Sequence, residues 1–354
     1  MAERAGAGAG EIDWDVARRR SAALTPAGPV VERAEAAALV AQIRAAAGRA
    51  PAIVGDVTGL HEAAQRAALL PTYVVDRARW AEANVAMFAA MIGDDLPPLG
   101  GFGSARLAGE QLGVLLSLLA SRVLGQFDPF TPTPDGGGRL LVVAPNVLHT
   151  QRELGFDPAD FQLWVCLHEQ THAVQFSAAP WLPGHLREHM SSLTSSMSQT
   201  SEASGRLRSL LEALPRALAG GPVDATSAGP IMSAVLTEAE QVQLERVLAV
   251  MSLLEGHADV VMDEAGPAVV PTVAKIRRAF ERRRDGNGLL DTLMRRLLGM
   301  DAKLAQYRQG AAFVRGVTGA VGHEGLNAVW TGPEQLPLAG EIADPAAWVR
   351  RVHG

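Results

Sequence analysis

The chain has 354 residues, of which 48% are apolar and 20% charged, and a formal net charge of −6. This balance is typical of a globular protein, and the negative charge argues against a general nucleic-acid binder. A single cysteine rules out an intrachain disulfide, and no apolar stretch approaches the 18 residues of a membrane span. We therefore expect a cytoplasmic protein that binds neither nucleic acid nor membrane; the composition leaves its oligomeric state open.

The first part of the chain predicts mostly helices. Residues 1–10 are rich in Gly and Ala and are expected to form a disordered tail. Ala/Leu-rich periodicity predicts helices over 32–49 and 60–93, and a long apolar helix is predicted over 105–125. The short β-branched run at 139–144, bounded by Gly and Pro, is the clearest strand.

The next predicted helix carries the most informative motif of the chain. Asp157 is a good N-cap, and Pro158 suits the first helical position. Apolar residues then recur at helical spacing to about Phe176. Residues 168–172, well inside this helix, spell H-E-x-x-H.

This motif indicates a metal site with catalytic chemistry. His168 and His172 are four residues apart, so on a helix both imidazoles lie on one face and can reach one Zn²⁺. Glu169 then lies beside the metal, where it can act as general acid and base toward water. The alternative is a buried helix whose histidines bond to backbone or water. Cys166, two residues before His168, should point away from the metal as a small buried side chain.

A third ligand is expected from a second long helix. It begins near Thr237, where T-x-x-E forms a capping box with Glu240. Near its far end, Glu255 and His257 compete for the ligand role, since they are about 200° apart around a helix. We favour Glu255 because Asp259 follows one turn later on the same face, where it can accept the outer N–H of a zinc-bound histidine. His257 remains the alternative ligand.

Other histidines are candidates for contacts with substrate. Hydrolysis at a carbonyl group needs a donor for the developing oxyanion, and His189, His257 and His323 compete for that task. His185 and His189 are also four apart, but no H-E-x-x-H pattern joins them. Residues 220–230 form a Gly- and Pro-containing loop that could cover a site as a lid. Further helices are predicted over 186–213, 272–284 and 287–308.

Several blocks of the chain resemble an actinobacterial family of zincin-like metallopeptidases. Its members are named as hydrolases associated with biosynthesis of the deazaflavin coenzyme. The motif helix, from Phe161 to Phe176, carries the main resemblance, which runs from about residue 11 to the C-terminus. Matching blocks include Ile12–Asp15, Gly28-Pro29, Pro180–Leu182, Met251–Asp263, Asn327–Trp330 and Asp344–Val352.

The resemblance implies a mainly α, zincin-like metallopeptidase fold with a small β element beside the H-E-x-x-H helix. It implies one zinc ion with His168 and His172 as ligands and Glu169 as the catalytic acid/base. It also favours Glu255 as the third ligand, with Asp259 behind a histidine.

We expect residues 11–354 to form a single zincin-like domain. The alternative is a domain of two lobes, with the motif helix in 11–225 and the third-ligand helix in 226–354. In zincins an edge strand runs beside the motif helix and can pair with an extended substrate, and the strand at 139–144 is a candidate for this role. A purely structural strand is the alternative.

The sequence thus predicts a zinc-dependent hydrolase of the metallopeptidase type that cleaves an amide bond in a peptide or small amide substrate. The rival is a non-catalytic zincin-like binding or scaffold protein linked to deazaflavin coenzyme enzymes, with a closed four-ligand metal site. A hydrolase of non-peptide amides or esters is a third option.

Overall fold

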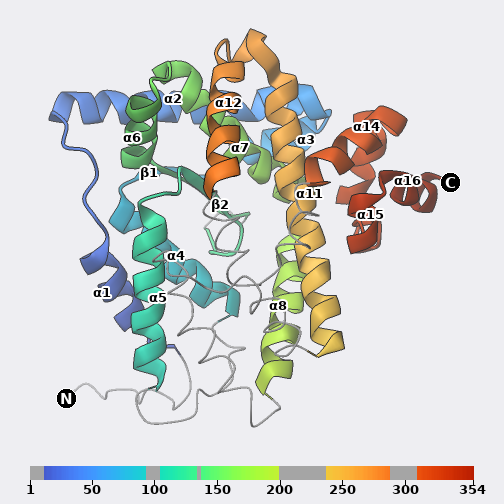
Figure 1. Cartoon of the computed structure of the whole chain (residues 1–354), viewed down its shortest axis with the longest axis horizontal. Helices are drawn as coiled ribbons and strands as arrows, with labels where there is room; N and C mark the ends of the chain where they lie inside the picture. The colour runs from blue at the N-terminus through green and yellow to red at the C-terminus, as the bar shows by residue number, and fades with distance from the viewer. Residues whose placement is uncertain (1–11, 93–103, 134–136, 199–236, 288–308) are drawn as a thin grey trace.

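The computed structural model describes residues 12–92, 104–133, 137–198, 237–287 and 309–354 and is mainly helical, with one three-stranded sheet (Figure 1). The strands are β1 (Thr72–Val75), β2 (Gly125–Asp128) and β3 (Arg139–Val143). The first helices are α1 (Trp14–Leu24), α2 (Arg33–Thr58), α3 (His61–Ala68), α4 (Arg77–Ile92), α5 (Ser104–Ala120) and α6 (Ala144–Leu154). The later ones are α7 (Pro158–Ala178), α8 (Leu182–Ser198), α11 (Glu238–Val269), α12 (Val273–Asn287), α14 (Gly310–Leu326), η2 (Asn327–Trp330), η3 (Pro333–Gln335), α15 (Ala339–Ala343) and α16 (Pro345–His353).

The sheet has the strand order β1-β3-β2, with β1 parallel and β2 antiparallel to β3. The strand predicted at 139–144 is confirmed as β3, but its expected place at the edge is wrong. Residues 140–143 are all buried, as the continuous apolar run of a central strand should be. The edge strand that packs against α7 is β2, which the sequence analysis did not predict.

The helix predicted over 60–93 is interrupted by a strand. Helix α3 ends at Ala68, and Pro71 precedes the β-branched residues of β1. Proline cannot donate a helical hydrogen bond and biases the residue before it away from the helical region. The Pro71 carbonyl instead accepts a bond of 2.9 Å from the Leu140 N–H, which extends the pairing of β1 with β3. The chain returns to helix at Arg77 in α4.

Helix α7 is the centre of the fold. It begins as predicted, because the Asp157 side chain accepts a bond from the Asp160 N–H and Pro158 occupies the first turn. It packs against α2 on one side and α11 on another, and side chains on all its faces are buried. One hydrophobic cluster joins Ile43, Leu167 and Val261, so both halves of the chain contribute to it. A helix buried all round is positioned rigidly by its neighbours.

Helix α11 runs past α7 along one side of the molecule (Figure 1). Its predicted capping box is present: Thr237 caps the helix and Glu240 bonds back to the Thr237 N–H. The helix kinks near its end at Gly266, whose φ of 65° only glycine adopts easily, just before Pro267.

Two glycines let α14 approach α11 closely. A Cβ on Gly256 would lie 2.1 Å from the backbone carbon of Gly310, and a Cβ on Gly310 would lie 2.0 Å from the Ser252 carbonyl oxygen. Each glycine therefore admits the backbone of the other helix. Because Gly256 follows Glu255 directly, this crossing also fixes the position of Glu255.

Some predictions fall on parts of the chain that the structure does not describe. These are the disordered tail at 1–10, the lid at 220–230 and residues 288–308 of the last predicted helix. Helix α12 covers the helix predicted over 272–284, and α8 covers the described part of the one at 186–213. Within the described ranges, every helix is too short or too polar to cross a bilayer.

Candidate metal centre

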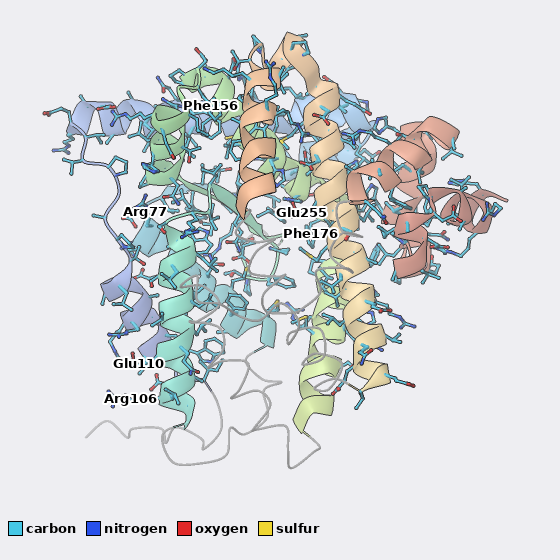
Figure 2. All side chains as sticks on the ribbon, in the orientation of Figure 1. Arg77, Arg106, Glu110, Phe156, Phe176 and Glu255 are labelled. Carbon is cyan, nitrogen blue, oxygen red and sulfur yellow. The ribbon has the colours of Figure 1, made fainter. Side chains whose placement is uncertain are left out.

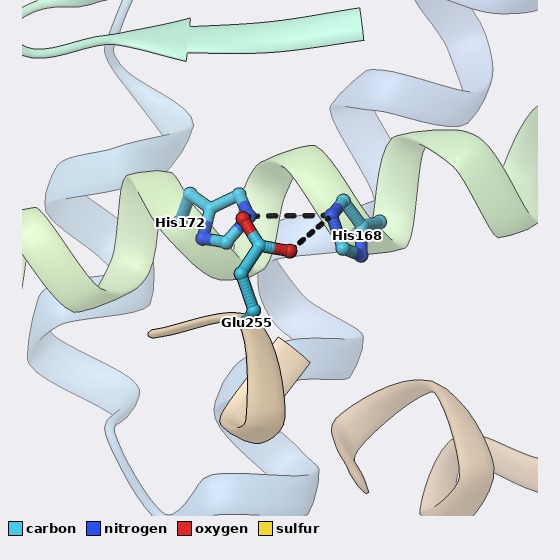
Figure 3. Close-up of side chains that lie close together, drawn as sticks. All are labelled: His168, His172 and Glu255. Carbon is cyan, nitrogen blue, oxygen red and sulfur yellow. Dashed lines mark hydrogen bonds and ion pairs between the residues drawn. The ribbon is translucent and has the colours of Figure 1, made fainter. Parts of the chain in front are cut away.

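His168 and His172 face each other on α7. Their Nε2 atoms are 3.3 Å apart, and the two rings are nearly perpendicular, with centroids 4.8 Å apart (Figure 3). This geometry follows from the one-turn spacing, which places both side chains on one face of the helix.

Glu255 reaches the same point from α11. Its carboxylate oxygens lie 3.5 Å from His168 Nε2 and 3.7 Å from His172 Nε2. Figure 2 shows Glu255 on the middle stretch of α11, far from either end of that helix. The Glu255 side chain is 49% exposed and that of His172 only 12%, so the cluster is open to solvent on the side of Glu255.

The donor set fits zinc. Ligand atoms of His168, His172 and Glu255 all lie within 4.8 Å of one another. Two nitrogens bound tetrahedrally at about 2.0–2.1 Å should be roughly 3.3 Å apart, which matches the distance between the two Nε2 atoms. Two imidazoles and one carboxylate are also a ligand set of catalytic zinc sites with an open fourth position.

Glu169 lies beside this cluster but points toward the sheet. Its side chain is buried, with 7% exposure, and the Phe127 N–H of β2 donates a hydrogen bond to it. A Cβ on Gly125, also in β2, would lie 2.7 Å from Glu169 Cγ and 2.9 Å from Oε1. Glycine at this position therefore makes room for the carboxyl group.

The surroundings of Glu169 favour its protonated form. Burial raises the pKa of Glu169 well above its ordinary value, and the nearby charge of Glu255 raises it further. The bond from the Phe127 N–H acts in the opposite direction but is outweighed. A carboxyl group whose pKa is raised in this way holds its proton more tightly than an ordinary glutamate does.

Behind His172, a buried glutamine links α7 to α11. Gln175 Oε1 lies 2.9 Å from His172 Nδ1, while Gln175 Nε2 donates to the Leu254 carbonyl at 2.9 Å. The same Nε2 lies 3.0 Å from Nδ1 of His257. His257 is fully buried, and its pKa is lowered to about 3. Burial is the largest cause, and the nearby His323 and His172 lower this pKa further. Among the described residues, the possible metal cluster includes Glu255 and does not include His257.

Asp259 is engaged with α12. Its carboxylate lies 3.3 Å from Arg277 Nη1, and Arg277 Nε also pairs with Asp263 at 2.6 Å. Arg315 of α14 completes this ion-pair network on Asp263. The expected role of Asp259 behind a zinc-bound histidine stays a prediction; behind His172 that place is taken by Gln175.

The remaining candidate histidines bond elsewhere. His189 Nδ1 lies 2.6 Å from Gln243 Oε1, and His323 Nε2 lies 2.6 Å from a Glu264 carboxylate oxygen. His185 and His189 are in edge-to-face ring contact. Among the described residues, none of these joins the three-residue metal cluster, so their proposed oxyanion role stays a prediction.

Two residues that contact the site were not predicted from the sequence. Gln175 lies three residues after His172, hence on the same helix face, and this spacing was the available signal. Gly125 carried no signal, because its role depends on β2 lying against Glu169. Cys166 is buried, with Sγ 3.8 Å from the Ile43 carbonyl oxygen, as expected for a residue that points away from the metal.

Comparison with known proteins identifies the family of the chain. Residues 12–349 match the family described as zincin-like metallopeptidase. A crystal structure described as a "putative hydrolase with a novel fold" from Chloroflexus aurantiacus shares 31% sequence identity, with a TM-score of 0.64, over 96% of this chain and 98% of that one. No curated protein matches the chain significantly. Since the family match spans nearly the whole sequence, the chain belongs to the zincin-like metallopeptidase family.

Proposed function

We propose that this protein is a zinc-dependent hydrolase of the peptidase type, which cleaves an amide bond in a peptide or small amide. The observation that carries the proposal is the convergence of His168, His172 and Glu255 from two helices, with buried Glu169 beside them. The family match and the likeness to a structure described as a putative hydrolase support the same class of reaction.

The three ligand residues and Glu169 have separate tasks. His168, His172 and Glu255 would hold zinc, which when bound polarises a carbonyl group and makes water more acidic. Glu169 takes a proton from the attacking water and delivers it to the leaving nitrogen. Its raised pKa suits the delivery step, and the positive charge of a nearby cation would lower that pKa and suit the first step.

We propose that the substrate lies along β2. The Val143 N–H donates a hydrogen bond to the Leu124 carbonyl, just before β2 begins. Hydrogen-bonded pairs recur at every second residue of an antiparallel ladder, so Gln126 also directs its backbone groups toward its partner Leu141 in β3. In an antiparallel pair the alternate residues, Gly125 and Phe127, turn their backbone groups to the open edge. Phe127 uses its N–H for Glu169, so an extended peptide pairing along this edge would pass the catalytic carboxyl group.

The rival function is a non-catalytic scaffold with a closed metal site. Within the described residues the metal cluster comprises three groups, and Glu255 is half exposed. An open fourth position is what a hydrolase needs and what a structural zinc site lacks. We therefore favour hydrolysis. The expected link to deazaflavin coenzyme biosynthesis stays a prediction.

The test combines metal analysis with one isosteric variant. Purified protein should contain close to one zinc per chain and should hydrolyse members of a peptide and amide library. Glu169→Gln should keep the zinc and lose at least about a hundredfold in turnover, since it removes the proton carrier but no ligand. Full activity of this variant would refute the mechanism, and an absence of zinc from the wild-type protein would refute the metal site.

A further inference from the structure

Gln175 connects the two halves of the metal centre through three contacts. Its side chain is fully buried between α7 and α11. Its carboxamide touches His172 on one side and, on the other, both the Leu254 carbonyl and His257. Both hydrogens of the NH₂ group are thereby used, and the amide oxygen faces the ring of a proposed zinc ligand.

The Leu254 carbonyl dictates which way this amide points. A carbonyl oxygen can only accept, so the group 2.9 Å from it must be the Gln175 NH₂. The amide oxygen must then face His172 Nδ1, and because that oxygen can only accept, Nδ1 must carry the proton. With its proton on Nδ1, His172 presents a lone pair on Nε2, which is the atom that faces His168 and Glu255.

The protonation of the His257 ring follows from this orientation. The ring Nδ1 lies 3.0 Å from the Gln175 NH₂ group and so accepts from it, which leaves the ring proton on Nε2. The ring packs against Trp330, with centroids 5.5 Å apart. An inverted amide would set its oxygen against the Leu254 carbonyl oxygen, a repulsive pair with no solvent to separate it.

We propose that Gln175 is a positioning residue: held by Leu254 and His257, it fixes the proton of His172 on Nδ1 and thereby prepares Nε2 to bind a metal. This inference rests on the zinc site of the proposed function. It also makes a mechanical link, since Leu254 precedes Glu255 in α11. One amide thus sets the tautomer of one ligand and ties the helix segment of another to α7.

The direct test is the tautomer of His172 in the metal-free protein, read from ¹⁵N chemical shifts of histidine-labelled samples. The wild-type protein should show the Nδ1–H form. Gln175→Met has a similar volume but no acceptor for Nδ1, so it should shift His172 toward the Nε2–H form. Zinc affinity, measured by competition with a chelator, should fall about ten- to a hundredfold.

Gln162→Met is the matched control, because Gln162 is also a buried glutamine of α7 but bonds to Gln42 and Gln151. It should leave the His172 tautomer and the zinc affinity unchanged. If Gln175→Met does not fold, His257 provides a second pair of variants. His257→Leu removes the acceptor and should weaken zinc binding, while His257→Asn restores an acceptor and should recover it.

A wild-type His172 protonated on Nε2 would overturn the inference, as would a Gln175→Met protein with unchanged tautomer and zinc affinity. Equal zinc affinity of His257→Leu and His257→Asn would overturn the role of His257. The tautomer is measured without metal, so it decides the inference even if no substrate is hydrolysed. Failure of hydrolysis with the expected tautomer and zinc affinity would refute the proposed function alone.

Discussion

Replacing Gly256 by alanine should separate the two helices that set the position of Glu255. A Cβ at this position would lie 2.1 Å from the Gly310 carbonyl carbon and 2.5 Å from both the Gly310 oxygen and the Ala311 nitrogen. The shortest of these distances is about 1.3 Å below the 3.4 Å at which ordinary contact begins. All three atoms belong to the backbone, so no rotamer change can relieve the clash.

The size of the effect follows from two opposing terms. Overpacking costs about 1–3 kcal/mol, and a clash between two backbones belongs at the upper end. Alanine is about 1 kcal/mol better than glycine inside a helix. We therefore expect Gly256→Ala to lower the free energy of unfolding by about 2 kcal/mol. Gly319→Ala is the control: it lies in α14, where an added methyl group would have no neighbouring atom within 4 Å, and it should gain up to about 1 kcal/mol.

Urea denaturation of the metal-free proteins, followed by far-UV circular dichroism, measures both variants on one scale. Chelator competition then tests the consequence for the site: because Glu255 moves with α11, zinc affinity of Gly256→Ala should fall about tenfold, equivalent to about 1.4 kcal/mol. The reasoning is refuted if Gly256→Ala is as stable as Gly319→Ala, or if it loses stability while its zinc affinity equals that of the wild type.

Three further predictions concern other residues. Gly125→Ala places a methyl group against the Glu169 carboxyl, so it should keep its zinc but hydrolyse substrate at least about tenfold more slowly; wild-type turnover would contradict this. Burial raises the pKa of the Cys166 thiol to about 12, so iodoacetamide should label it only after unfolding, and rapid labelling of the native protein in a mass spectrum would be the opposite result. Burial tends to raise the pKa of Glu341, but hydrogen bonds from Arg351 and a backbone N–H outweigh it and leave the pKa lowered. The pKa of Glu341 in the folded protein therefore lies below the unfolded value of about 4.3, so the ionised carboxylate stabilises the folded state. This contribution is present at neutral pH and is lost as the pH falls through the folded pKa. Glu341→Gln should therefore be less stable than wild type at pH 7 but not in strong acid, and urea curves showing a pH-independent gap would rule this out.

The part of the site that lies within one helix could be predicted from the sequence. The capping residues Asp157 and Pro158 set the start of α7, and the spacing of His168 and His172 places both on one face of any helix. These features depend only on helical geometry, which residues a few positions apart specify by themselves. The position of Glu255 does not follow from the geometry of a single helix, because its approach to the histidines depends on how α11 packs on α7.

The sheet was predicted less well, because strand roles depend on pairing. β3 was predictable from its apolar, β-branched residues, but its central place is defined by β1 and β2 on either side. β1 follows an Ala-rich helix and has four residues, too few to show alternation against that background. β2 contains a glycine and two polar residues among its four, a composition that does not favour a strand.

The contacts that support the metal centre could not be predicted from the sequence. The partner that orients Gln175 is the Leu254 carbonyl, a group that every residue carries and that no sequence pattern can single out. Gly125 acts through an absent side chain, and its importance follows only from the position of Glu169 beside it. The sequence shows which residue types can bind a metal. The orientation of these residues, however, depends here on backbone groups that the fold brings close to them. Because a catalytic metal site needs both, the H-E-x-x-H motif can indicate the chemistry, but the packing of α7 against α11 and β2 determines whether that chemistry is available.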